Sequence, residues 1–207
     1  MSRPRGGNRT TGSNSLMSDT AFTLSAMTIA ASHRAAAARP GPDDPGPRAV
    51  RRNTARALVL DPGGRALLFD REAKIRDVGD RCLYTPGGAV EAGETPAEAA
   101  ARELDEELGL RVAPADLGSP VATCYSLQQR IDTGAFVAAD DVFFLLHADP
   151  ADIAFASAAH AETAGHAWLD PDGMDAAPHR ILPRGLPGLL RRLLDEGPPA
   201  SPIHIRW

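Results

Sequence analysis

Apolar and polar positions alternate with the period of a strand in several short runs after residue 50. Two such runs flank the turn signal Asp61-Pro62-Gly63-Gly64, and two later ones predict a hairpin, the second of them nearly all apolar over residues 142–146. The predicted strands are residues 55–60, 65–70, 120–129, 135–147 and 166–169, the last followed by a turn at 170–173.

Apolar residues recur with helical spacing in two other segments. Residues 96–108 carry a stripe of alanine and leucine, and Thr95 with Glu98 forms a capping box at the start. Pro96 suits the first helical position, and Gly109 is the expected left-handed stop. Residues 186–194 predict a second helix with four leucines on one face, which would cover the other side of the sheet.

The first helix places three carboxylates away from its apolar stripe. Glu103, Glu106 and Glu107 are spaced i, i+3 and i+4, so they converge and repel one another. A hard divalent cation such as Mg²⁺ or Mn²⁺ is the natural compensation. Arg102 can pair with Glu106 or with Glu94 and hold a carboxylate in place. The competing interpretation is a solvated acidic face, the usual role of charged runs on helices.

These residues belong to a longer motif. Residues 88–110 fit G-x5-E-x7-R-E-U-x-E-E-x-G-U, where U is a bulky aliphatic residue, at every specified position. The run resembles the Nudix box of the Nudix hydrolases, and residues 84–88 resemble the strand and turn that precede it. The resemblance implies an α/β/α sandwich around a mixed β-sheet. It also implies a Mg²⁺- or Mn²⁺-dependent hydrolase that cleaves the pyrophosphate of a nucleoside diphosphate linked to another group.

Roles in the site follow from the same resemblance. Glu103 and Glu107 would be the principal metal ligands, and Glu106 a further ligand or the holder of a coordinated water. The carbonyl of Gly87 would complete part of the coordination shell. Arg102 would orient its neighbours. Glu94 would play an auxiliary part in the catalytic set formed by Glu106, Glu103, Arg102 and Glu94.

The box does not fix the general base or the substrate contacts. Glu106 is the best base within it, and outside it Asp140, Asp141 and Glu162 are alternatives, although a surface acid is the simpler interpretation of each. For substrate contacts we expect Gly88 and Arg76. Arg71 and Lys74, in the polar segment 71–81, are further basic side chains that either contact phosphate or are simply solvated.

Composition sets limits on the class of protein. Residues 1–50 hold six arginines and three aspartates, so the net charge of −5 leaves −8 on the remainder. Such an acidic domain is a poor nucleic-acid platform. No stretch is long enough for a membrane span, and two cysteines are too few for a disulfide framework, so we expect buried thiols. The expected location is the cytoplasm, and a homodimer is compatible with the resemblance.

We expect three regions: a disordered extension (1–50), a catalytic domain (51–197) and a flexible tail (198–207). The substrate stays open among a nucleoside triphosphate, an oxidised nucleotide, ADP-ribose and a nucleotide sugar. The alternative to an enzyme is a non-catalytic Nudix-fold sensor that binds a nucleotide, although residues after 167 offer too few helices for an attached DNA-binding unit.

Overall fold

The computed structural model describes residues 49–155 and 163–207. The predicted disordered extension lies outside these residues except for its last two positions, and Glu162 lies outside them too. The strands are β1 (Ala49–Leu60), β2 (Ala66–Glu72), β3 (Arg81–Tyr84), β4 (Gly87–Ala89), β5 (Ala122–Gln129), β6 (Phe136–His147), β7 (Thr163–Leu169), β8 (Arg180–Leu182) and β9 (Ile203–Ile205). The helices are α2 (Pro96–Leu108), α4 (Pro171–Ala176) and α5 (Leu186–Glu196), with short 3-10 turns at η1 (Pro114–Leu117) and η2 (Pro150–Asp152).

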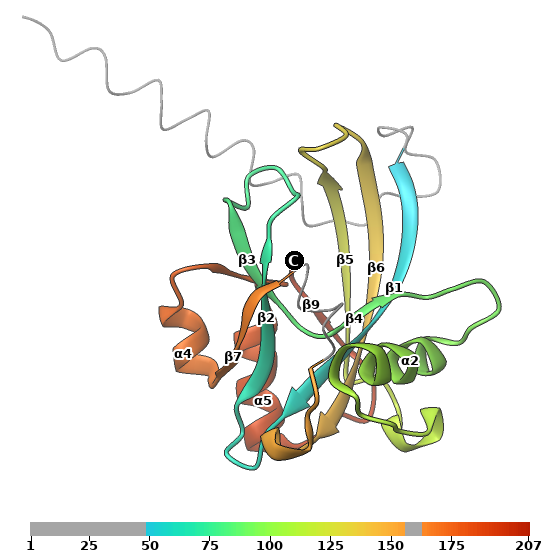
Figure 1. The fold of residues 1–207 in the computed structure, drawn as a ribbon, viewed down its shortest axis with the longest axis vertical. Helices are drawn as coiled ribbons and strands as arrows, with labels where there is room; N and C mark the ends of the chain where they lie inside the picture. Colours follow the sequence, from blue (N-terminus) through green and yellow to red (C-terminus); the bar gives the residue numbers. More distant parts are fainter. Residues whose placement is uncertain (1–48, 156–162) are drawn as a thin grey trace, which may run out of the picture. The chain divides into compact units, whose positions relative to one another are not determined.

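The strands form one mixed sheet that opens into two arms. β1 runs parallel to β6 over its whole length, β5 completes the predicted hairpin with β6, and β9 lies parallel to β5 on the outside. β2 pairs with β3 and β7. β1 and β2 meet only at Leu60 and Ala66, next to the turn that joins them, so the two arms diverge away from this turn (Figure 1).

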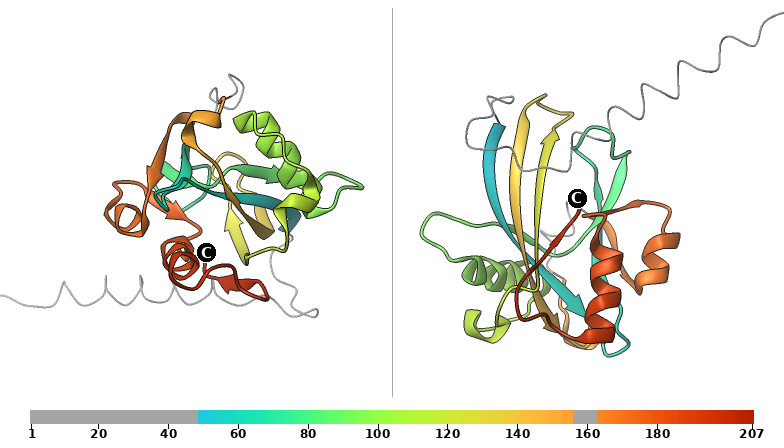
Figure 2. Two further views of the ribbon diagram at one scale, coloured as in Figure 1. Left: turned by 90° about the horizontal axis from the view of Figure 1, so that it is seen from below. Right: turned by 180° about the vertical axis from the view of Figure 1, so that it is seen from behind.

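Helices cover both faces of the sheet. Ala55, Ala57 and Val59 of β1 pack in a cluster with the apolar side of α2, whereas Leu58 and Leu60 point to the other side, where α5 packs. Figure 2 shows α2 and α5 on opposite sides of the strands. The α/β/α arrangement with a mixed sheet confirms the predicted fold class. Alternation along one strand therefore divides the core into two clusters.

Both predicted helices are present. Thr95 accepts a hydrogen bond from the N–H of Glu98, the Glu98 carboxylate accepts one from the N–H of Thr95, and Gly109 ends α2 with φ of 66°. Of the four leucines predicted on one face of α5, Leu189, Leu190 and Leu193 are buried, but Leu194 is 47% exposed. Its side chain lies over Gly64, where an added Cβ would come within 2.8 Å of it. Leu194 therefore borders the β1–β2 turn rather than the core.

Two predictions at the C-terminal end were wrong. Residues 198–207 are not a flexible tail, because β9 pairs with β5 and the carbonyl of Arg206 accepts from the N–H of Gly185. Trp207 then packs against buried residues, with its ring 6.5 Å from that of Tyr84. After β7, the expected turn is the short helix α4, which the Asp170 carboxylate caps by accepting from Gly173. Proline and glycine suggested a turn there, but Pro171 occupies the first helical position.

The cysteines and the helices bear on two expectations drawn from composition. Cys82 and Cys124 are free and buried, as predicted. Within residues 49–155 and 163–207, no helix combines the length and the apolar character that crossing a membrane requires.

Candidate active site

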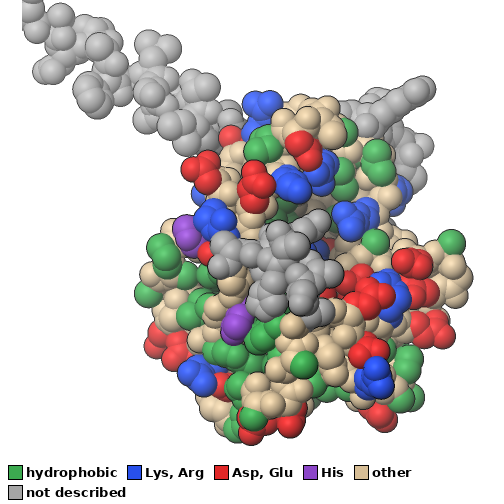
Figure 3. Space-filling model, in the orientation of Figure 1, with side chains coloured by type: hydrophobic (Ala, Val, Ile, Leu, Met, Phe, Trp, Pro, Cys, Tyr) green, Lys and Arg blue, Asp and Glu red, His purple; other side chains and the backbone are tan. Residues whose placement is uncertain are grey.

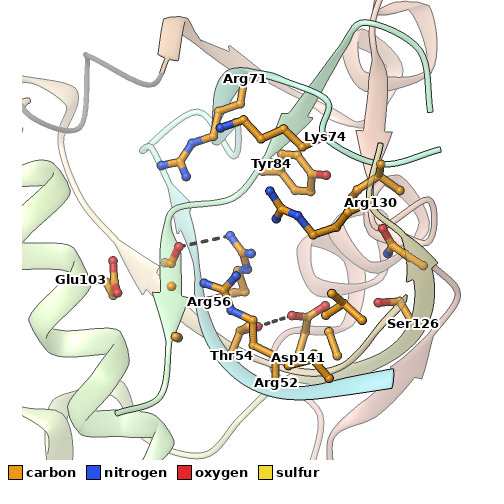
Figure 4. A pocket seen from close by; sticks show the side chains of 18 of the residues that line it. Arg52, Thr54, Arg56, Arg71, Lys74, Tyr84, Glu103, Ser126, Arg130 and Asp141 are labelled. Atoms are coloured by element: carbon orange, nitrogen blue, oxygen red, sulfur yellow. Dashed lines mark hydrogen bonds between the residues drawn. The ribbon is translucent and has the colours of Figure 1, made fainter. Parts of the chain in front are cut away.

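A pocket of about 960 Å³ lies where the two arms of the sheet diverge. Its wall is made by β1, β5 and β6 on one side and by β2 and the segment after it on another. The Gly-Gly strand β4 and the carboxylates of α2 close one end (Figure 4). The separation of β1 from β2 therefore creates the space, and α2 supplies its acidic end.

Glu107 is the buried carboxylate of this end, with 7% of the residue exposed. It accepts a hydrogen bond from the N–H of Gly87 at 2.8 Å and pairs with the Arg71 guanidinium at 2.5 Å. Burial raises the pKa of Glu107 above the ordinary value, although Arg71 and the Gly87 amide oppose this. The carboxylate is thus fixed against β4 and has a cation as its partner.

The two glycines of β4 permit close approach from both sides. At Gly88 an added Cβ would lie 2.1 Å from Oε1 of Glu103, so that carboxylate rests directly over the backbone. At Gly87, whose φ is +125°, an added Cβ would lie 2.3 Å from the carbonyl oxygen of Ala55. Gly87 is therefore required by the sheet, and Gly88 by the site.

Arg102 organises the exposed side of the acidic cluster. Its guanidinium donates to Glu94 at 2.8 and 3.1 Å, to Glu103 at 2.9 Å and to Glu106 at 3.2 Å. It also donates to the carbonyl of Ala89. The Glu94 partner comes first among the causes that raise the pKa of Arg102, and Arg102 in turn lowers the pKa of Glu94. The orienting role predicted for Arg102 is consistent with this geometry. The Glu106 side chain remains 59% exposed.

The family model described as NUDIX domain matches residues 50–187. The chain belongs to the Nudix family. It is therefore a Nudix hydrolase, an enzyme of the pyrophosphohydrolase type. The structure is similar to that of the MutT protein from Methanosarcina mazei Go1, at 18% identity and a TM-score of 0.54, covering 72% of this chain and 96% of that one. It is also similar to a MutT NUDIX hydrolase from Burkholderia pseudomallei, at 20% identity and a TM-score of 0.49, covering 70% and 98% of the two chains.

The Nudix fold implies a divalent cation, and the oxygen atoms available at this end of the pocket are of the type that such a cation prefers. Glu103 and Glu107 bring carboxylate oxygens to the same pair of glycines, and Mg²⁺ and Mn²⁺ prefer such oxygens. As they stand, no three acidic, histidine or cysteine side chains of the described residues are close enough to hold an ion together. The Gly87 carbonyl accepts from Arg56 at 3.2 Å. Binding an ion would therefore require Arg71 and Arg102 to release the carboxylates that they now neutralise.

Of the basic residues expected near phosphate, Arg71 and Lys74 line the pocket of this Nudix domain. Arg76 is exposed and does not line it; its backbone N–H donates to the carbonyl of Gln129. The loop therefore presents a different face from the one expected. Asp141 is not a surface acid, since it is 4% exposed in the pocket wall and accepts from the Thr54 hydroxyl. Asp140, its neighbour on β6, is only partly buried.

Several side chains of the pocket have no counterpart in the sequence-based prediction. Arg52, Thr54 and Arg56 alternate along β1 and line one wall, and Tyr84 and Trp207 add two aromatic rings. Arg52 and Arg56 are four residues apart and would lie on the same face of a strand, which alternation could have revealed. Residues 49–54 contain so many polar side chains that the strand was predicted to begin later, and Trp207 was assigned to a flexible tail.

Proposed function

We propose that this chain hydrolyses the pyrophosphate linkage of a nucleoside diphosphate joined to another group, with Mg²⁺ or Mn²⁺ as cofactor. The observation that supports the proposal most is the buried Glu107 carboxylate. It is held against Gly87 beside Glu103, in a pocket large enough for a nucleotide. A buried carboxylate whose charge is balanced by one partly exposed arginine can exchange that partner for a metal ion.

Glu103 and Glu107 would hold the cation, and Glu106 would hold a water coordinated to it. When bound, such an ion stabilises charge on phosphoryl oxygens and makes water more acidic. Arg102 would keep Glu103 and Glu94 in place through the hydrogen bonds that it already makes. Its role is positioning, since it points at carboxylates.

Glu106 is the group proposed to receive the proton of the attacking water. Its carboxylate is the most exposed of the three, and within residues 49–155 and 163–207 its one side-chain partner is Arg102, at 3.2 Å. A base must reach water and must be free to accept a proton, which Glu107 is not while it is buried between two donors. Asp141 is the alternative base, but its carboxylate is buried in the pocket wall and accepts a hydrogen bond from Thr54.

The experiment is a hydrolysis assay on a panel of ADP-ribose, nucleotide sugars, nucleoside triphosphates, oxidised nucleotides and dinucleoside polyphosphates. Activity should require Mg²⁺ or Mn²⁺, disappear with EDTA and return when the ion is added back. Glu107→Gln should lower turnover by about 100-fold or more, whereas Glu196→Gln, an exposed substitution on α5, should not change it. Tight nucleotide binding with no turnover at high enzyme concentration would contradict the proposal and support the non-catalytic sensor instead.

A further inference from the structure

The register of three strands builds one wall of the pocket. Thr54, Asp141 and Cys124 lie side by side on β1, β6 and β5, and the next row on the same face is Arg52, Ala139 and Ser126. A third row holds Val50, Val137 and Gln128. The pairing therefore fixes Arg52 two residues from the buried Asp141 and well along the wall from the Gly-Gly strand.

Charge is divided unequally along this pocket. Four glutamates line the end formed by α2 and the segment that precedes it. Arg71 also lines the pocket, but its charge is paired with Glu107 at the acidic end. The rest of the pocket, here called the basic half, is lined by five basic side chains against two carboxylates, Glu72 and Asp141. These basic side chains are Arg51, Arg52, Arg56, Lys74 and Arg130.

The side chains of the basic half converge from separate elements. Arg52 and Arg56 come from β1, Lys74 from the segment after β2, and Arg130 from the end of β5, and all are seen around the same space in Figure 4. In Figure 3 acidic side chains gather over α2, and in the upper part of the view basic side chains lie among further acidic ones. Because these cations come from three parts of the sheet, the fold and not a local sequence run brings them together.

Four of these five cations make no ion pair among residues 49–155 and 163–207. Arg56 is occupied by the carbonyls of Thr85 and Gly87, and Arg130 pairs with Asp132. Arg51, Arg52 and Lys74 make no ion pair with any described residue. Arg51 and Arg52 are consecutive in β1, so their side chains point to opposite faces of the strand, and Arg52 is the one on the face of Thr54 and Asp141. Unpaired like charges that face one cavity repel one another, and a multiply charged anion relieves that repulsion.

We propose that the substrate carries a phosphate group in addition to the two phosphates of the bond that is cut, and that Arg52 and Lys74 bind it. The inference rests on the proposed function, which puts the cleaved pyrophosphate at the α2 end. Guanidinium and ammonium groups are the usual partners of phosphate oxygens. The pocket volume, about 960 Å³, leaves room for a ligand that extends from one end to the other.

The extra phosphate can come from two sources with the same chemistry. It is either part of a longer polyphosphate chain or a phosphate ester elsewhere on the substrate. Arg52 comes from β1 and Lys74 from the segment that follows β2, so a group bound by both would be held across the opening between the two arms. The two residues would therefore act on substrate affinity, measured by KM, and would leave kcat nearly unchanged.

The first test measures binding without catalysis. Inorganic tripolyphosphate is titrated calorimetrically into the full chain in EDTA, where the acidic end repels the anion and only the basic half attracts it. Arg52→Gln and Lys74→Gln should each weaken binding about 10-fold, the usual effect of losing a hydrogen bond to a charged group. Arg192→Gln, an exposed change on α5, serves as the matched control. Wild-type affinity in both pocket variants would overturn the proposal.

The second test uses substrates that differ by phosphate alone. NADPH and NADH differ by one phosphate ester, and diadenosine tetraphosphate and diphosphate differ in chain length. With Mn²⁺, kcat/KM should favour the phosphate-rich member of at least one pair, and the double variant Arg52→Gln/Lys74→Gln should remove that preference through KM. The pair that shows it identifies the source. Equal kcat/KM within both pairs would overturn the inference while leaving the hydrolase intact. If no substrate of any kind were cleaved, the proposed function would fail, and tripolyphosphate binding would still decide the role of the basic half.

Discussion

The two ends of the pocket handle charge in opposite ways. At the α2 end, Arg71 and Arg102 already neutralise the carboxylates, so an added cation must displace existing partners. In the basic half, Arg52 and Lys74 have no partner among the described residues, so an anion can bind without displacing anything. A substrate with phosphates along its length would thus bind the acidic α2 end through a metal ion and the basic half by direct contacts with its cations.

The largest effect should follow from neutralising Glu107. Glu107→Gln removes a buried charge that is proposed to bind metal, so kcat should fall by about 100-fold or more, the equivalent of several kcal/mol of lost charge stabilisation. Far-ultraviolet circular dichroism should stay unchanged. Steady-state kinetics beside Glu196→Gln provides the measurement. Equal turnover in the two variants would show that the acidic end is not catalytic.

The glycines of β4 should separate function from stability. Gly88→Ala would push the Glu103 carboxylate away from its position and should lower kcat/KM by about 100-fold, the typical effect of a 1 Å displacement, with little change in Tm. Gly87→Ala would clash with the backbone of β1 at a left-handed φ and should destabilise the fold by about 3 kcal/mol. Urea unfolding and kinetics on both variants make the comparison. A larger stability loss for Gly88→Ala than for Gly87→Ala would contradict it.

Trp207 tests whether the C-terminal residues belong to the basic half. Trp207→Ala should cost about 1–3 kcal/mol of unfolding free energy, less than a fully buried tryptophan, because the residue is only partly buried. It should also raise KM, since the ring lines the pocket. Trp207→Phe should recover most of both effects. Unchanged urea unfolding in Trp207→Ala would mean that the tail does not dock.

The hydrogen bond from Thr54 to Asp141 stabilises the wall of the basic half. Thr54→Val keeps the shape but leaves the buried Asp141 without this hydrogen-bond donor, at a cost of about 1–3 kcal/mol. The double change Thr54→Val/Asp141→Asn should recover part of that loss, because the uncompensated charge is gone. Chemical denaturation of the single and double variants measures the coupling. Purely additive losses would indicate that the two side chains do not interact.

The smallest effect concerns the thiol of Cys124, which lies beside Asp141 in the same wall. Burial, followed by the nearby Asp141, raises the pKa of Cys124 to about 12, so at pH 8 almost none of it is thiolate. Iodoacetamide should therefore leave it unmodified in the native protein and modify it fully in urea, as mass spectrometry can follow. Stoichiometric modification of the native protein would show that the strands around Cys124 readily expose this thiol to solvent.

Features that depend on neighbouring residues were predictable from the sequence. The limits of α2 follow from Thr95, Glu98 and Gly109, and its acidic face follows from i, i+3 and i+4 spacing. The likeness of the whole run to the Nudix box supplied the fold class. All of these signals lie within 23 consecutive residues.

Features that depend on distant pairing were not predictable in the same way. The first half of β1 is polar, and it is a strand because β6 pairs with it along its whole length. β9 forms because β5 offers an open edge, and α4 forms because Asp170 caps it. The basic half combines Arg52, Lys74 and Arg130 from separate elements, so no single stretch of sequence could reveal it.

Mn²⁺ uptake by the purified chain tests the central claim most directly. Electron paramagnetic resonance of free Mn²⁺, titrated with protein in the presence of a slowly hydrolysed nucleotide analogue, reports the bound ion without relying on turnover. Wild-type protein should remove Mn²⁺ from solution, and the double variant Glu103→Gln/Glu107→Gln should not, although it remains folded. Identical uptake by the two proteins, or none by either, would contradict the account.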